Sequence, residues 1–66
     1  MQIYLNGEAR EVASALTVAD LLEDLALAGR RLAVEVNLEI VPRSAYADIV
    51  LQPGDRVEVV HAIGGG

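Results

Sequence analysis

The chain opens with alternating apolar and polar positions. Apolar side chains occupy every second residue from Met1 to Leu5, which is the period of a β-strand with one buried face. Asn6-Gly7 follows, and this dipeptide favours a type I′ hairpin turn because both residues tolerate a positive φ. The chain returns over 8–13 as a weakly apolar segment. We therefore expect an N-terminal hairpin whose second strand lies near a sheet edge.

An amphipathic helix is predicted after the hairpin. Thr17 is typical of a helix N-cap, and Asp20 occupies the matching position of a capping box. The apolar positions that follow have the i, i+3, i+4, i+7 spacing of one helix face. They are Val18, Leu21, Leu22 and Leu25. Gly29 is suited to the left-handed residue that stops a helix, so we expect the helix to end there.

Short strands and turns are predicted in the rest of the chain. Pro42 ends one strand, because proline cannot donate a hydrogen bond to a sheet ladder. Pro53 suits the second position of a type I or II turn. In the strand after it, Val57 and Val59 are expected to face inward. The predicted strands cover 32–37, 39–41 and 56–62.

The order of these elements predicts an α+β fold. One helix can cover one face of one sheet, and two layers are the smallest arrangement that buries both apolar faces. The last strand can then pair in parallel with the first strand at the sheet centre. This is the β-grasp, or ubiquitin-like, architecture, with a mixed sheet of four to five strands under one main helix. We expect a domain over 1–63 and a glycine tail over 64–66.

The tail carries the main functional hypothesis. The sequence ends in Gly64, Gly65 and Gly66, which together reach roughly 10 Å when extended. Glycine allows close backbone approach, so Gly64 and Gly65 suit threading into a narrow active site of a partner enzyme. The α-carboxylate of Gly66 is then the candidate reactive group. The alternative is an ordinary flexible terminus.

Composition limits the other classes of function. The 66 residues include no cysteine, phenylalanine or tryptophan, so the core is aliphatic and no disulfide framework is possible. The net charge of −5 disfavours nucleic acid as a partner and suits a basic protein surface. The sequence has no long apolar run and no signal-peptide pattern. We therefore expect a cytoplasmic protein without a membrane partner.

The end of the last strand supplies a candidate docking patch. Val60, Ala62 and Ile63 are apolar and follow outward-facing positions, although scattered exposed aliphatic residues are also common. His61 has no partner in the sequence that would make it catalytic. The acidic residues of the helix lack a nearby histidine or cysteine, so we interpret them as a solvated face. We expect no catalytic residue and no bound metal or cofactor.

Several segments together resemble the ThiS family of sulfur carriers in thiamine biosynthesis. The resemblance covers nearly the whole chain, and its most specific parts are the Glu39-Ile40-Val41-Pro42-Arg43 segment after Asn37 and the terminal glycines. Leu38 departs from the pattern, because such proteins often have a glycine or a polar residue in this turn. The other matching segments are Met1–Glu8, Thr17–Leu22, Val34–Leu38 and Gly54–Val60.

The resemblance implies a carrier that is a co-substrate and not an enzyme. In such proteins an adenylyltransferase uses ATP to activate the C-terminal carboxylate, here that of Gly66. A cysteine-desulfurase-derived persulfide then yields a thiocarboxylate, which donates sulfur to thiazole synthase. Three alternatives stay open: the small subunit of molybdopterin synthase, a ubiquitin-like protein modifier, and a non-covalent β-grasp interaction domain with an idle tail.

Overall fold

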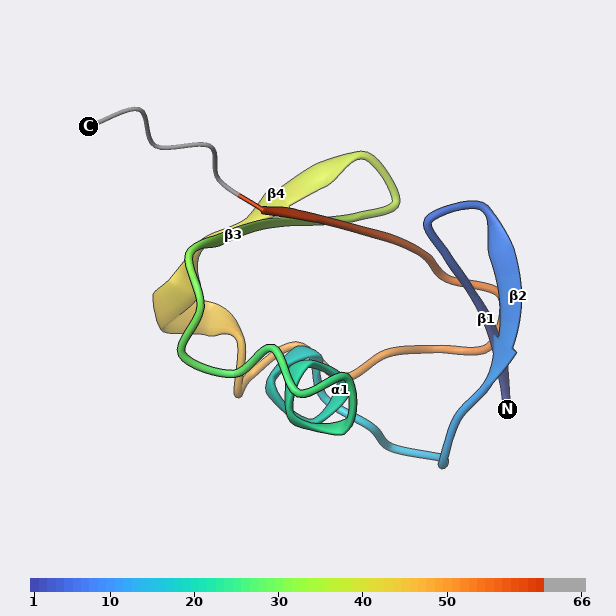
Figure 1. The fold of residues 1–66 in the computed structure, drawn as a ribbon. Helices are drawn as coiled ribbons and strands as arrows, with labels where there is room; N and C mark the ends of the chain where they lie inside the picture. Colours follow the sequence, from blue (N-terminus) through green and yellow to red (C-terminus); the bar gives the residue numbers. More distant parts are fainter. Residues whose placement is uncertain (62–66) are drawn as a thin grey trace.

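A five-stranded mixed sheet and one short helix form the fold of this chain (Figure 1). The computed structural model describes residues 1–61. Its elements are β1 (Gln2–Leu5), β2 (Glu8–Glu11), α1 (Val18–Asp24), β3 (Leu32–Val36), β4 (Glu39–Val41), the 3₁₀ helix η1 (Arg43–Ala45) and β5 (Arg56–His61). No helix in this part of the chain is long and apolar enough to cross a membrane.

The strand order β2-β1-β5-β3-β4 places the last strand at the centre of the sheet. β5 runs parallel to β1 and antiparallel to β3, while both hairpins are antiparallel. β2 lies at an edge and all its residues are exposed. The predicted β-grasp topology is therefore confirmed, including the parallel pairing of the first and last strands.

The core lies between α1 and one face of the sheet (Figure 1). Inward-facing strand residues such as Ile3 and Val57 meet Leu21 of the helix, and all three are almost fully buried. None of the described elements covers the opposite face of the sheet, which we call the open face. The buried core comprises Ile3, Leu16, Val18, Leu21, Leu22, Val34, Val41, Leu51, Val57 and Val59.

The helix begins as predicted and ends earlier than predicted. The capping box is present, since the Asp20 N–H donates to Thr17 Oγ1 at 3.0 Å and the Thr17 N–H donates to Asp20 Oδ2 at 3.1 Å. The expected stop at Gly29 is wrong, because α1 ends at Asp24. Gly29 has φ +80° but belongs to the following turn.

A Schellman motif closed by an alanine ends the helix. The Ala26 N–H donates to the Glu23 carbonyl at 2.9 Å and the Leu27 N–H donates to the Leu22 carbonyl at 2.7 Å, which is the hydrogen-bond pattern of that motif. Ala26 consequently has φ +59°, a conformation that glycine adopts at lower cost. The sequence does not predict this helix end, because the residue in the left-handed position is an alanine and not a glycine.

We expect Ala26→Gly to stabilise the protein by about 0.5–1 kcal/mol, because it relieves the left-handed backbone strain of an L-residue. The thermal midpoint should rise by about 3–6 °C for a domain of this size. Ala28→Gly is the matched control, since Ala28 is exposed and has no positive φ; its midpoint should stay level or fall. Equal losses in the two variants would contradict this assignment.

Candidate functional site

The candidate site begins where β5 leaves the sheet. His61 is the last residue of β5 and pairs with Leu32 of β3, and its side chain is exposed. The tail residues singled out from the sequence, Gly64, Gly65 and Gly66, lie outside the described residues, as do Ala62 and Ile63. The structure thus describes the scaffold from which the tail extends.

Asn6 of the first hairpin holds β5 close to its exit. Its side-chain Oδ1 accepts the Val59 N–H at 2.9 Å, and its Nδ2 donates to the Val59 carbonyl at 3.2 Å. The Asn6 N–H also donates to the Val57 carbonyl at 2.9 Å. The amide side chain therefore extends the parallel ladder beyond Leu5, where the β1 backbone turns into the hairpin.

Asn37 of the second hairpin holds the beginning of β5 from the other side. Its Oδ1 accepts the Arg56 N–H at 3.0 Å, and its Nδ2 donates to Asp55 Oδ1 at 3.0 Å. Asp55 Oδ2 in turn accepts the Gln52 N–H at 2.8 Å. Both hairpin asparagines have positive φ values, 50° for Asn6 and 52° for Asn37. They fix β5 at two points and so define where the tail starts.

Val60 is the one predicted docking residue that the structure describes. Its side chain is 58% exposed and lies across from Ala33 of β3. The parity of β5 places it on the open face with Arg56 and Glu58, because Val57 and Val59 are buried on the helix side. The position of Val60 is compatible with partner contact, and its role stays a prediction.

Three more exposed hydrophobic side chains lie near this face, and the docking patch predicted from the sequence did not include them. Tyr4 is 40% exposed, Leu38 83% and Ile40 77%. Ile40 lies across from Glu35, which is on the open face together with its β5 partner Glu58. The two-residue turn at Asn37-Leu38 sets this register, so the facing of Ile40 could have been deduced from the hairpin pattern.

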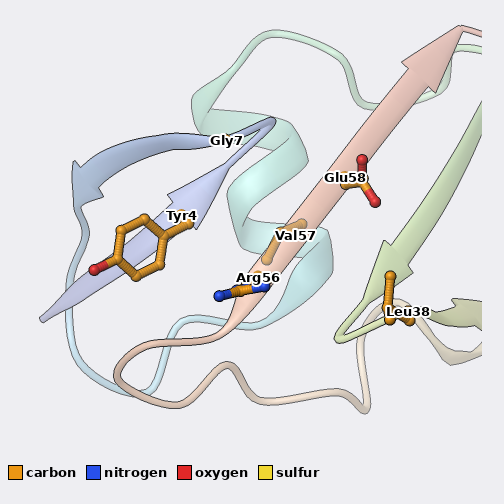
Figure 2. A pocket seen from close by; sticks show the side chains of 6 residues that line it. All are labelled: Tyr4, Gly7, Leu38, Arg56, Val57 and Glu58. Atoms are coloured by element: carbon orange, nitrogen blue, oxygen red, sulfur yellow. The ribbon is translucent and has the colours of Figure 1, made fainter.

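A hollow of about 330 Å³ lies between the tips of the two hairpins. Figure 2 shows Tyr4 and Leu38 on opposite sides of β5, with Arg56 and Glu58 between them. The complete lining is Tyr4, Gly7, Leu38, Arg56, Val57 and Glu58. The hollow has the size to accept a large side chain from another protein.

Charge on the open face is not balanced. Glu35 and Glu58 lie directly opposite each other in the β3–β5 register, and like charges in such pairs are destabilising. In the described part of the chain the one ion pair joins the N-terminus to Glu11, so neither glutamate forms an ion pair there, and the nearest arginine along β5 is Arg56, two positions from Glu58 on the same face. Within residues 1–61, no group of three or more His, Cys, Asp or Glu side chains could hold a metal ion.

Comparisons with known proteins give a consistent result. Residues 3–66 match the model of the ThiS family. The chain is 38% identical over 66 residues to the sulfur carrier protein ThiS of Escherichia coli, covering 100% of both. A crystal structure of the thiamine biosynthesis protein ThiS from Geobacter metallireducens has a TM-score of 0.88 at 35% identity, also with 100% coverage of both chains.

A thiazole synthase from Paramagnetospirillum magneticum is also similar. It is 47% identical over 66 residues, which is 100% of this chain and 20% of that protein. The chain therefore spans about a fifth of the length of this longer relative.

Proposed function

The chain belongs to the ThiS family, and from this membership we propose that it carries sulfur for thiamine biosynthesis on the carboxyl group of Gly66. The observation that carries the proposal is the match with the sulfur carrier of Escherichia coli, which includes every residue of both chains. The same membership favours the thiamine pathway over the molybdopterin and protein-modifier alternatives. A carrier of this kind would work in the cytoplasm.

The proposed chemistry starts from an unreactive group. A carboxylate is a resonance-stabilised anion and a poor electrophile, so an adenylyltransferase first joins the Gly66 carboxylate to the AMP part of ATP and releases pyrophosphate. The terminal sulfur of a cysteine-derived persulfide attacks the acyl carbon, and AMP leaves. A thiol then cleaves the sulfur–sulfur bond by reduction, and the thiocarboxylate stays on Gly66. Thiazole synthase transfers the sulfur to its substrate, and an oxygen atom from that substrate or from water replaces it on the acyl carbon, which regenerates the Gly66 carboxylate.

The chain's own residues supply reach and placement in this proposal. Gly64 and Gly65 thread into the partner's active site, and ordering the three glycines costs about 3–6 kcal/mol. Glycine buries too little apolar surface to offset that cost. The folded domain must therefore provide affinity, and Val60 on the open face, with Ala62 and Ile63, is the proposed contribution. β5, fixed by Asn6 and Asn37, sets the distance from this contact to Gly66.

The test is the intact mass of the chain after incubation with ATP, the adenylyltransferase, a persulfide source and a reducing thiol. We expect a mass increase equal to replacement of one oxygen by one sulfur, located on Gly66 by fragmentation of the C-terminal peptide. Omitting ATP is the control, and it should leave the mass unchanged. An unmodified Gly66 in the complete reaction would overturn the proposal.

A further inference from the structure

Leu38 has an unfavourable backbone conformation that its own fold does not offset. It is the second residue of the two-residue turn between β3 and β4, with φ +70°. Glycine, asparagine and aspartate are preferred in such turns, because a left-handed conformation brings Cβ too close to the backbone. The side chain is 83% exposed, so packing within the domain recovers little of the cost. Strained residues of this kind cluster at functional sites.

The Glu35–Glu58 pair is a second local source of destabilisation, independent of the backbone strain at Leu38. Glu35 and Glu58 are register partners of β3 and β5, so their side chains leave the same face of the sheet, with Glu35 half-buried and Glu58 exposed. All five basic residues of the chain are arginines, yet in the described part none forms an ion pair with either glutamate. A cation from outside the chain would remove the repulsion.

The strained Leu38 and the Glu35–Glu58 pair lie beside the same exposed apolar side chains. Ile40 lies across from Glu35, and Val60 lies two positions beyond Glu58 on β5. Leu38 and Glu58 both line the hollow between the hairpin tips, with Tyr4 on its far side (Figure 2). The open face therefore presents apolar side chains next to two neighbouring glutamates that form no ion pair in the described part of the chain.

We propose that Leu38 and the Glu35–Glu58 pair are the specificity determinants for binding thiazole synthase, which inserts a basic side chain between the two carboxylates and receives Leu38 in an apolar pocket. The inference rests on the proposed function. Thiazole synthase is the chosen partner because the thiazole synthase from Paramagnetospirillum magneticum contains a segment 47% identical to this chain. In that protein a segment similar to this chain and the rest of the thiazole synthase belong to one molecule. The net charge of −5 suits a basic surface.

The first arm of the experiment separates binding from folding at Leu38. The dissociation constant of each variant for purified thiazole synthase is measured by calorimetry, together with its thermal midpoint. Leu38→Gly removes the strain and the side chain, so the midpoint should stay level or rise while binding weakens about tenfold, the loss typical of a significant interface contact. Ala26→Gly is the matched control, because it relieves a similar positive φ of +59° away from the sheet and should leave binding unchanged.

The second arm tests the carboxylate pair. Glu35→Gln and Glu58→Gln should each raise the thermal midpoint, and the double variant should add little, because the first change already ends the repulsion. Each should weaken binding several-fold and make its salt dependence shallower. Glu23→Gln is the control, because it removes the same single negative charge on the exposed side of α1. Its binding and the salt dependence of its binding should change only by the small amount that the net charge alone causes.

Sulfur transfer by the same variants at saturating thiazole synthase separates this inference from the proposed function. Transfer should be retained there, because the tail is unchanged. Wild-type affinity in Leu38→Gly and both glutamine variants would overturn the inference and leave the carrier function intact. Variants that bind the adenylyltransferase more weakly but bind thiazole synthase as the wild type does would also overturn the inference. A large fall in the thermal midpoint of Leu38→Gly would do the same. A wild-type chain that neither binds nor transfers sulfur would overturn both.

Discussion

Adding one alanine after Gly66 is expected to abolish sulfur loading of the chain. The added residue moves the terminal carboxylate by roughly 3.5 Å, whereas a misplacement of about 1 Å can already cost 100-fold in rate. The measurement is the fraction of chain converted to thiocarboxylate, read from intact mass, with the adenylyltransferase and persulfide source in excess. The thermal midpoint should not change, because the addition lies beyond β5.

Gly66→Ala is the matched control for this extension. It adds the same methyl group but keeps the carboxylate at its original distance from β5, so part of the loading should persist. An extended chain that is loaded as fast as the wild type would be incompatible with a reaction at the Gly66 carboxylate.

Leu21→Ala is expected to have the largest effect on stability. Leu21 is 0% exposed and lies in the core between α1 and the sheet, and truncating such a leucine costs about 2–5 kcal/mol. A domain of 66 residues has a free energy of unfolding of only about 3–10 kcal/mol. The thermal midpoint should fall by about 10 °C or more, as followed by circular dichroism.

Leu38→Ala is the control for Leu21→Ala, because it makes the same leucine-to-alanine change on the surface. Leu38 is 83% exposed and alanine keeps the Cβ atom, so the midpoint should move by less than the equivalent of about 0.5 kcal/mol. A midpoint for Leu21→Ala as high as that of Leu38→Ala would show that the helix contributes little to the core.

The candidate site was only partly predictable from the sequence. The outward facing of Val60 follows from strand alternation, and the structure confirms its exposure. The role of Asn6 in holding Val59 does not follow, because the two residues are 53 positions apart. The contact arises only when the first and last strands become neighbours. The tail glycines from Gly64 to Gly66 remain a prediction from the sequence.

The sequence by itself determined the local elements. Side-chain alternation, Asn6-Gly7 and the Thr17–Asp20 capping box act over a few residues, so their physics is present in any short segment that contains them. The order of hairpin, helix and late strand then restricted the topology to the β-grasp. The misplaced helix end marks the limit of local reasoning, since Ala26 adopts a left-handed conformation without the usual glycine.

Only the tertiary structure decided which distant residues meet. The β3–β5 register places Glu35 opposite Glu58, and the same sheet places Leu38 and Tyr4 around one hollow. Register depends on the packing of the whole sheet against α1, because a shift of one residue would turn every side chain to the other face. The proximity of Glu35 to Glu58 and the exposure of the strained Leu38 therefore cannot be inferred before the register of the sheet is known.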